Sequence, residues 1–201
     1  MSDMTAYRIG AVILAAGKAT RMGEQKLLMP LGEDTLLGRV IECVSSAAVF
    51  SEIVVVYSNE NVKALAQQKR LKTVINEQPE RGLSSSLKLG LGELSDEIEA
   101  FMFFSGDQPF INNAIVMELV QAYLADKSHI VVPSYSGSRG MPTIFPAKWR
   151  NDLMQLEGDA GGRTIIKNHP EEVRLVEIEQ SAAGFDIDTK EDYEKALNFK
   201  I

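Results

Sequence analysis

The chain has 201 residues, of which 45% are hydrophobic and 24% are charged, and its formal net charge is −7 at pH 7. This length fits one domain with a substantial core, so we expect residues 1–201 to form a single domain. The acidic balance argues against a nonspecific nucleic-acid or anionic-membrane surface, and no apolar stretch approaches the ~18 residues of a membrane span. We therefore expect a cytoplasmic protein without a nucleic-acid or membrane partner.

Short apolar runs alternate with helical patterns along the chain, an order typical of βαβ units. The first four runs are unbroken rather than alternating, as expected when helices cover both faces of a sheet. The sequence therefore predicts an α/β fold with a mostly parallel central sheet and right-handed crossovers. The predicted strands are Ile9–Ala15, Ile53–Tyr57, Thr73–Ile75, Ala100–Ser105, Ile130–Pro133, Thr143–Phe145 and Val173–Ile178. The predicted helices are Leu36–Ala47, Asn61–Gln68, Ser84–Leu94, Asn113–Ala125, Ala147–Gln155, Gly161–Asn168 and Lys190–Phe199.

The segment after the first predicted strand runs from Leu14 to Lys26 and reads LAAGKATRMGEQK. A tight turn that is poor in side chains lets backbone N–H groups approach phosphate oxygens, and nearby cations neutralise the phosphate charge. A Walker loop would need Ser or Thr after Gly17-Lys18, and a dinucleotide fingerprint would need a third glycine. An ordinary loop with solvated cations is the alternative, but the whole string favours a polyphosphate site. Its glycines and cations are Gly17, Gly23, Lys18, Arg21 and Lys26.

The string Gly106-Asp-Gln-Pro109 follows the predicted strand Ala100–Ser105. An acidic residue just past the carboxyl end of a parallel strand lies where open α/β sheets bind ligands. Asp107 suits Mg²⁺, which uses one or two protein carboxylates together with substrate phosphates. A surface turn is the alternative, since Gly, Asp and Pro are common turn formers.

Asp186-Ile-Asp188 near the C-terminus offers a second carboxylate for the metal. In an extended segment Asp186 and Asp188 point to the same side while Ile187 points into the core. Thr189 and Asp192 form a capping-box pattern that starts the last helix. The choice between Asp186 and Asp188 stays open, and acidic residues that merely favour a helix start are the alternative.

Asn76 ends a predicted strand, and Gly82-Leu-Ser-Ser-Ser86 opens a predicted helix. Hydroxyls and free N–H groups at a helix start can hold a base, ribose or phosphate. N-capping by one serine is the alternative, although capping needs only one of the three.

Two further predicted loops each offer an arginine to an anion. They are Gly137–Pro142 with Arg139 and Gly158–Arg163 with Arg163, and for each an ordinary solvated loop is the alternative. Cys43, the only cysteine, lies among apolar residues and is expected in the core.

Together these strings resemble the molybdenum-cofactor nucleotidyltransferase group within the α/β nucleotidyltransferase superfamily. The resemblance runs through nearly the whole chain. It covers Leu14–Lys26, Asn76, Gly82–Leu87, Gly106–Pro109, Arg139–Pro142, Gly158–Arg163 and Asp186–Asp192. It implies a three-layer Rossmann-like nucleotidyltransferase fold, Mg²⁺ dependence and release of pyrophosphate.

The resemblance, together with the residues themselves, implies the following roles for individual side chains. Asp107 is the principal Mg²⁺ ligand with Asp188 or Asp186 as its partner, and Arg21, Lys26 and Asp107 carry the catalysis. The residues expected to bind the nucleotide are Leu14, Ala15, Ala16, Gly17, Arg21, Lys26, Asn76, Gly82, Ser84, Ser85, Ser86 and Asp107. The residues expected to bind the acceptor are Arg139, Pro142 and Arg163.

Ala15-Ala16-Gly17 resembles the cytidylyl branch of the group, so CTP is the favoured nucleotide and molybdopterin or the molybdenum cofactor the expected acceptor. A molybdoenzyme or its chaperone is a possible partner for the product. Met141 stands where a polar residue is usual, and Gly162 where alanine is usual. The alternatives are a guanylyltransferase on the same cofactor, a sugar- or alditol-phosphate nucleotidyltransferase, and a nucleotide- or cofactor-binding carrier without turnover.

Overall fold

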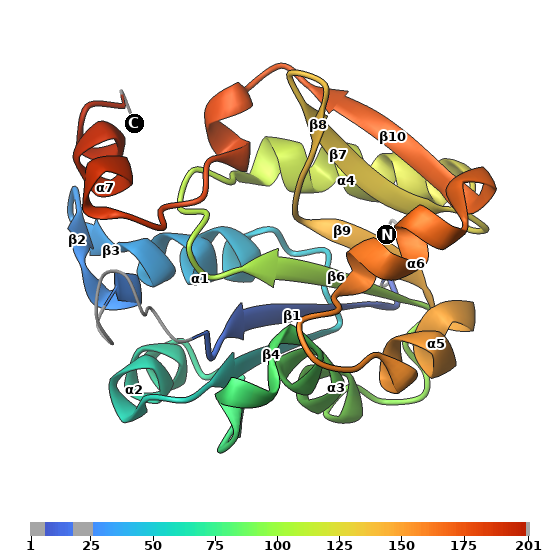
Figure 1. Ribbon diagram of the computed structural model, residues 1–201, viewed down its shortest axis with the longest axis horizontal. Coiled ribbons are helices and arrows are strands. Elements are labelled where there is room, and N and C mark those ends of the chain that lie inside the picture. The colour runs from blue at the N-terminus through green and yellow to red at the C-terminus, as the bar shows by residue number, and fades with distance from the viewer. Residues whose placement is uncertain (1–6, 18–25, 200–201) are drawn as a thin grey trace, which may run out of the picture.

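The computed structural model describes residues 7–17 and 26–199. Its centre is an eight-stranded sheet in the order β10-β7-β9-β6-β1-β4-β5, with β8 paired to β7 (Figure 1). The strands of this sheet are β1 (Ile9–Ala15), β4 (Glu52–Tyr57), β5 (Lys72–Ile75), β6 (Ala100–Ser105), β7 (Ile130–Tyr135), β8 (Ser138–Arg139), β9 (Thr143–Pro146) and β10 (Val173–Ile178). A separate hairpin pairs β2 (Pro30–Leu31) with β3 (Asp34–Thr35). The helices are α1 (Leu36–Ser46), α2 (Glu60–Gln68), α3 (Leu83–Gly92), α4 (Asn113–Ala125), α5 (Arg150–Gln155), α6 (Gly162–Asn168) and α7 (Lys190–Leu197).

The pairing in the large sheet is mostly parallel, as predicted. β1 pairs in parallel with both β4 and β6, so that Leu14 lies opposite Val56 on one side and Ser105 on the other. β4 pairs in parallel with β5, and β7 with β10. β9 departs from this pattern because it runs antiparallel to both β6 and β7. The parallel strands therefore end at one edge of the sheet, and β9 begins there.

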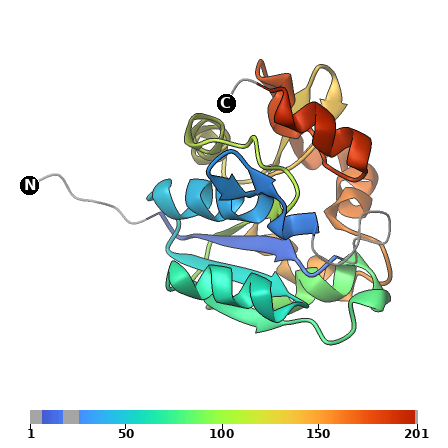
Figure 2. The same cartoon turned by 90° about the vertical axis from the view of Figure 1, so that its left-hand side faces the viewer.

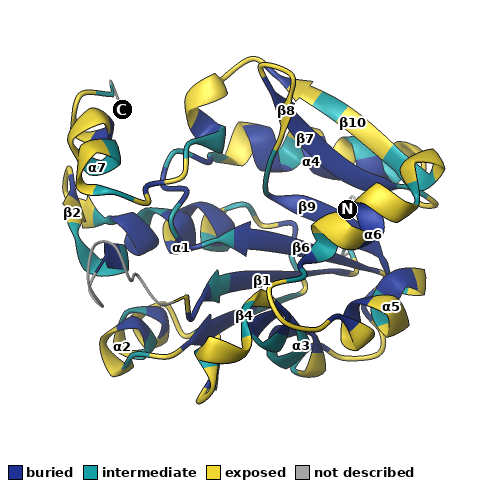
Figure 3. Cartoon of the chain, in the orientation of Figure 1, coloured by how far each residue is buried: buried dark blue, intermediate teal, exposed yellow. Residues whose placement is uncertain are grey.

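Side chains alternate between two apolar clusters along the central strands. Ala11 and Ile13 of β1 face the cluster formed with α1, α2 and α4, whereas Val12 faces the cluster formed with α3, α5 and α6. Strands that are covered on both faces carry apolar residues at every position, which explains the unbroken runs in the sequence. The strands of the sheet centre are buried while the outer faces of the helices are exposed (Figure 3). The predicted three-layer α/β architecture is confirmed.

Threonine side chains cap the starts of α1 and α7. The Thr35 hydroxyl accepts a hydrogen bond from the Gly38 N–H at 3.0 Å and caps α1. Thr189 and Asp192 form the predicted capping box at the start of α7. The predicted helix over 147–155 is instead a 3₁₀ turn followed by the short α5. β2, β3 and β8 were not predicted, because two-residue strands are too short to produce a periodic pattern.

The C-terminal helix α7 lies apart from the two helical layers. It packs beside the β2–β3 hairpin around a third, smaller apolar cluster that includes Leu31, Leu36, Ile187 and Ala196 (Figures 1 and 2). Ile187 is fully buried there, as the alternation of the Asp186–Asp188 segment predicted. None of the helices in the described part of the chain is long and apolar enough to cross a membrane.

Candidate active site at the carboxyl edge of the sheet

Three charged side chains from distant parts of the chain meet at the carboxyl edge of the sheet. The Lys26 ammonium lies 2.8 Å from the Asp107 Oδ2 atom and 3.0 Å from the Asp188 Oδ1 atom. Lys26 starts a 3₁₀ turn after the first loop, Asp107 follows β6, and Asp188 precedes α7. The Lys26 side chain is 10% exposed, against 21% for Asp107 and 56% for Asp188. The ammonium is therefore buried between two carboxylates that reach solvent on their outer sides.

The local backbone holds both carboxylates in place. The Ser105 hydroxyl donates to the Asp107 Oδ1 atom, so that both oxygens of this carboxylate are engaged. The Ile187 N–H donates to the Asp107 carbonyl oxygen at 3.3 Å, which ties the two acidic segments together. The Asp188 N–H donates to the Asp192 side chain at 3.2 Å, within the first turn of α7. The two carboxylates are thus positioned by the chain itself.

Burial and the charges of this cluster shift the pKa values of Lys26 and of the neighbouring Asp186. Burial alone would lower the pKa of Lys26, but the charges and hydrogen bonds of Asp107 and Asp188 outweigh it and raise that pKa. The pKa of Asp186 is raised because the surrounding protein removes water from its carboxyl and because Asp107 carries a like charge. The neighbouring Gln108 amide and the Arg163 charge oppose this rise. Lys26 therefore stays protonated at neutral pH.

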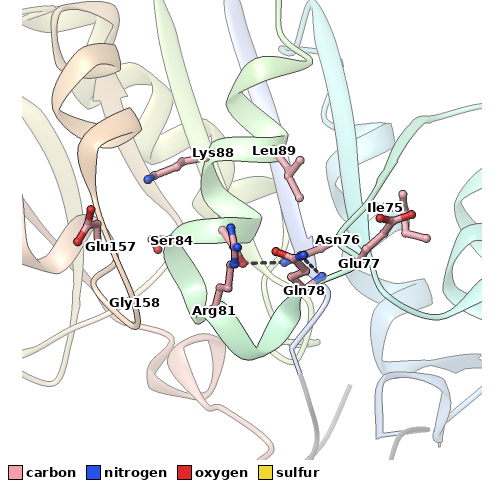
Figure 4. Close-up of a pocket in the computed structure, with 11 residues that line it drawn as sticks. Ile75, Asn76, Glu77, Gln78, Arg81, Ser84, Lys88, Leu89, Glu157 and Gly158 are labelled. Carbon is pink, nitrogen blue, oxygen red and sulfur yellow. Dashed lines mark hydrogen bonds between the residues drawn. The ribbon is translucent and has the colours of Figure 1, made fainter.

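A first pocket of about 840 Å³ opens beside the N-terminal end of α3 (Figure 4). The Asn76 amide donates to the Ser85 hydroxyl at 2.8 Å and to the Ser86 hydroxyl at 2.9 Å, joining the end of β5 to α3. No serine caps α3, so N-capping does not account for the three hydroxyls. Asn76, Ser84 and Ser85, which were expected to bind the nucleotide, line this pocket. Lys88 and Glu157 are among the lining residues that the sequence reasoning missed.

Gly82 brings two loops into contact at this pocket. Its φ of 87° and ψ of −178° lie in a region that is open almost only to glycine. A Cβ atom on Gly82 would lie 2.4 Å from the carbonyl carbon of Gly158. The Ser84 N–H donates to the Gly158 carbonyl oxygen at 3.1 Å, which holds the contact. Gly82 therefore fixes the start of α3 against the loop that leads to α6.

The described part of the first loop ends at Gly17. The Leu14 carbonyl accepts a hydrogen bond from the Gly106 N–H at 3.0 Å, so the loop starts beside the Asp107 turn. Ala15 and Ala16 are buried, and Gly17 is exposed with open space around it. Arg21, expected to bind the triphosphate, lies outside the described residues.

A second pocket of about 250 Å³ adjoins the charged cluster. Arg139 of β8 and Arg163 of α6 both line it, so two of the three residues expected to bind the acceptor come together. Pro142, the third, is buried and does not contribute to the lining. Asp186 lines this pocket, whereas Asp188 pairs with Lys26. The structure thereby separates the two aspartates that the sequence left as alternatives.

Gln108 and Tyr135 also line the second pocket and were missed by the sequence reasoning. Gln108 lies inside the Gly106–Pro109 string, where its position beside Asp107 was the available signal. Tyr135 ends β7 and donates from its hydroxyl to the Met141 carbonyl at 2.8 Å, a contact without a sequence signal. A Cβ atom on Gly162 would lie 2.6 Å from the Phe145 ring, so that a larger residue there would need this ring to shift.

Comparisons with known proteins identify the family of this chain and support its fold. The model of the MobA-like NTP transferase domain family matches residues 11–173. A relative named probable molybdenum cofactor guanylyltransferase, from Natranaerobius thermophilus, is 28% identical over 95% of this chain and 96% of its own length. A crystal structure of the Mycobacterium tuberculosis Rv0371c homologue from Mycobacterium sp. strain JC1 is 30% identical, with a TM-score of 0.81 over 95% of this chain and 96% of that one. The Rv0371c structure from M. tuberculosis H37Rv is 25% identical, with a TM-score of 0.84 over 97% and 100%. The chain belongs to the family of MobA-like NTP transferase domains and is a nucleotidyltransferase.

Proposed function

We propose that this nucleotidyltransferase transfers CMP from CTP to the terminal phosphate of molybdopterin or the molybdenum cofactor and releases pyrophosphate. The observation that carries the proposal is the convergence of Lys26, Asp107 and Asp188 beside a pocket lined by two arginines. The three converging side chains supply charges for a triphosphate and its metal, and the two arginines supply charges for a phosphorylated acceptor.

Mg²⁺ is the metal we assign to Asp107 and Asp188. One oxygen atom of each carboxylate already contacts the same cation, the Lys26 ammonium, so the two carboxylates are placed to bind one cation together. Among residues 7–17 and 26–199, no group of three or more His, Cys, Asp or Glu side chains is arranged to hold a metal. This fits Mg²⁺, which is held by one or two carboxylates and completes its coordination with waters and substrate phosphates. When bound, it neutralises charge on the phosphate oxygens and on the pyrophosphate that leaves.

The reaction needs no general base from the protein. A phosphate monoester with a second pKa near ~6 is already largely dianionic at neutral pH. One of its oxygens attacks the α-phosphorus of the nucleotide, and the bond from that phosphorus to the bridging oxygen of pyrophosphate breaks. The chain's task is to hold the two reactants in line and to stabilise negative charge. Lys26 does so by moving from the carboxylates onto the phosphates, and Arg21 supplies a second cation.

The acceptor phosphate is assigned to Arg139 and Arg163. An arginine presents a planar fork of donors that matches phosphate oxygens, and paired arginines bind such groups more tightly than isolated ones. Asp186 and Gln108 line the same pocket and can accept hydrogen bonds from N–H groups of the acceptor. A ligand with an anionic end and an end rich in N–H donors, such as a phosphorylated pterin, fits this lining.

The nucleotide has a second candidate. The Ala15-Ala16-Gly17 string favours CTP, whereas the name of the Natranaerobius relative favours GTP. A thermal-shift panel of CTP, GTP, ATP and UTP with Mg²⁺ separates them. Ligand at ~100 times Kd adds roughly 2.7 kcal/mol, a Tm rise on the order of 5–10 °C. A rise for CTP alone supports the cytidylyl assignment, and a rise for GTP alone replaces it with the guanylyl one.

Turnover is tested by pyrophosphate release with purified molybdenum cofactor as the acceptor, comparing the unsubstituted chain with Asp107→Asn. The substitution keeps the shape of the side chain but removes its charge, so release is expected to fall by orders of magnitude while the chain still unfolds cooperatively, at a somewhat lower Tm because Lys26 loses a charged partner. Release with a sugar phosphate but not with the cofactor would reassign the acceptor. Nucleotide binding without release under any condition would leave a binding protein and contradict the proposal.

A further inference from the structure

The C-terminal helix α7 and Phe199, two residues after it, contact the chain segments that carry Lys26, Asp107 and Asp188. We propose that Phe199, just after this helix, is a positioning residue that sets the separation of the Asp107 and Asp188 carboxylates. The inference rests on the proposed function, since it gives Phe199 a role through the metal and phosphate site. It concerns a residue that touches neither substrate nor metal.

The Phe199 ring joins the two acidic segments directly. Its centroid lies 4.9 Å from that of Phe110 with the planes at 63°, and 5.3 Å from that of Phe185 with the planes at 72°. Phe110 follows Asp107 in the same loop, and Phe185 directly precedes Asp186. Edge-to-face pairs of this kind each contribute about 0.5–1.5 kcal/mol beyond the burial of their area. The Phe199 ring therefore packs against both the loop that carries Asp107 and the segment that carries Asp188.

The same helix also reaches the Lys26 segment. The Tyr193 hydroxyl donates to the Pro30 carbonyl oxygen at 2.5 Å, and Pro30 starts β2, which one residue separates from the turn that Lys26 starts. The Met29 N–H donates to the Lys26 carbonyl oxygen at 3.1 Å, which ties this turn to β2. Figure 1 shows α7 beside β2 and β3, at the end of the molecule where β1 and β6 finish. The segments that carry Lys26, Asp107 and Asp188 thus all pack against α7 or Phe199.

The packing around α7 is separate from the main core. The residues under α7 belong to the small cluster around Leu31 and Ile187, whereas the sheet is held by the two large clusters. A change at Phe199 should therefore shift the carboxylates without unfolding the sheet. Replacing residues that hold metal ligands in place without touching the metal typically changes metal affinity or activity by 10–100-fold.

The test measures binding of Mn²⁺ to the full chain, with and without CTP, by electron paramagnetic resonance well below the Tm of each variant. Phe199→Ala is expected to weaken Mn²⁺ binding roughly tenfold. Phe199→Tyr keeps the ring and should restore it. Leu197→Ala is the matched control, because Leu197 lies on the same helix and is 53% exposed. In pyrophosphate release, Phe199→Ala should lower kcat while the KM for CTP changes little, since α7 does not reach the first pocket.

The outcomes separate the two proposals. Unchanged Mn²⁺ affinity in Phe199→Ala with a lowered Tm would reduce Phe199 to a structural residue and overturn the inference. Equal weakening in Leu197→Ala would also overturn it, because the effect would then not belong to the ring. Absence of Mn²⁺ binding by the unsubstituted chain, even with CTP, would contradict the metal assignment to Asp107 and Asp188, and the inference with it.

Discussion

The Lys26 ammonium lies 2.8 Å from an Asp107 carboxylate oxygen although 81 residues separate the two along the chain. Asp188 joins the same ammonium at 3.0 Å. The two carboxylates assigned to the metal thus share one cation of the chain itself, which offsets one of their two negative charges. A divalent metal and Lys26 compete for the same oxygen atoms, and an incoming triphosphate gives Lys26 another anionic partner.

Replacement of Lys26 by methionine should therefore have two opposite effects in the absence of nucleotide. The free energy of unfolding should fall by about 1 kcal/mol, because the partly buried Asp107 carboxylate loses a charged hydrogen-bond donor while the more exposed Asp188 is compensated by solvent. Mn²⁺ should bind roughly tenfold more tightly, equivalent to about 1.4 kcal/mol, because the competing ammonium is gone. Urea unfolding and Mn²⁺ titration check the two effects. Lys63→Met is the control, because Lys63 pairs with Glu60 on the exposed surface of α2. Unchanged or weaker Mn²⁺ binding would contradict the competition.

A methyl group on Gly82 should separate the two loops that meet at the first pocket. Gly82→Ala is expected to destabilise the protein by about 1–3 kcal/mol, because the backbone conformation excludes a side chain and the Gly158 carbonyl is in the way. Gly92→Ala is the matched control. A Cβ atom there meets nothing within 4 Å, and helical alanine is favoured over glycine by about 0.5–1 kcal/mol. Thermal unfolding should move Tm down for the first and up for the second, and equal shifts would contradict this account of Gly82.

Cys43 should make the stability sensitive to alkaline pH. Burial, assisted by the charge of Glu42, raises the pKa of its thiol to about 12. An unfolded cysteine has a pKa of about 8.5. Its contribution to stability is therefore complete below pH ~8.5 and is lost as pH rises toward the folded value. Between pH 7.5 and 10 the unsubstituted chain should lose about 2 kcal/mol more than Cys43→Ala in urea unfolding. Parallel pH profiles for the two chains would show that the thiol does not contribute in this way.

Arg163 should matter for the acceptor and not for the nucleotide. Arg163→Met removes a charged donor from the second pocket, and a hydrogen bond to a charged group contributes about 1.5–3 kcal/mol. The KM for the molybdenum cofactor should rise roughly tenfold or more, with the KM for CTP unchanged. Arg174→Met, on the edge strand β10, is the control, because Arg174 is exposed and bonds the Ala122 carbonyl. A rise in the KM for CTP alone would move Arg163 to the nucleotide side.

The fold followed from the sequence because each strand carries its own local signal. β1, β6 and β10 have the predicted bounds, since apolar runs bounded by polar loops mark strands directly. The antiparallel direction of β9 had no such signal, because pairing depends on contacts made far along the chain. The charged cluster was predicted in part. Lys26, Asp107 and Asp188 were selected by their motifs, but the ion pairs between them depend on where three separate loops end in space.

The contribution of α7 to the site could not be predicted for a related reason. Phe199 belongs to no phosphate, metal or acceptor motif, and its contacts are with Phe110 and Phe185 in other segments. A lone aromatic residue near a terminus reads as core or surface from its neighbours alone. Only the folded arrangement distinguishes a ring that fills space from one that joins two functional segments.

The reversed strand β9 has a consequence for how this architecture can diversify. Because β9 begins at the edge where its neighbours finish, the turn from β8 delivers Gly140 and Met141 to that edge without a crossover helix. The hairpin of β7 and β8 can therefore change length or sequence while the βαβ units of the other half keep their register. Because Arg139 of β8 lines the second pocket, such changes would alter that pocket and leave Lys26, Asp107 and Asp188 in place.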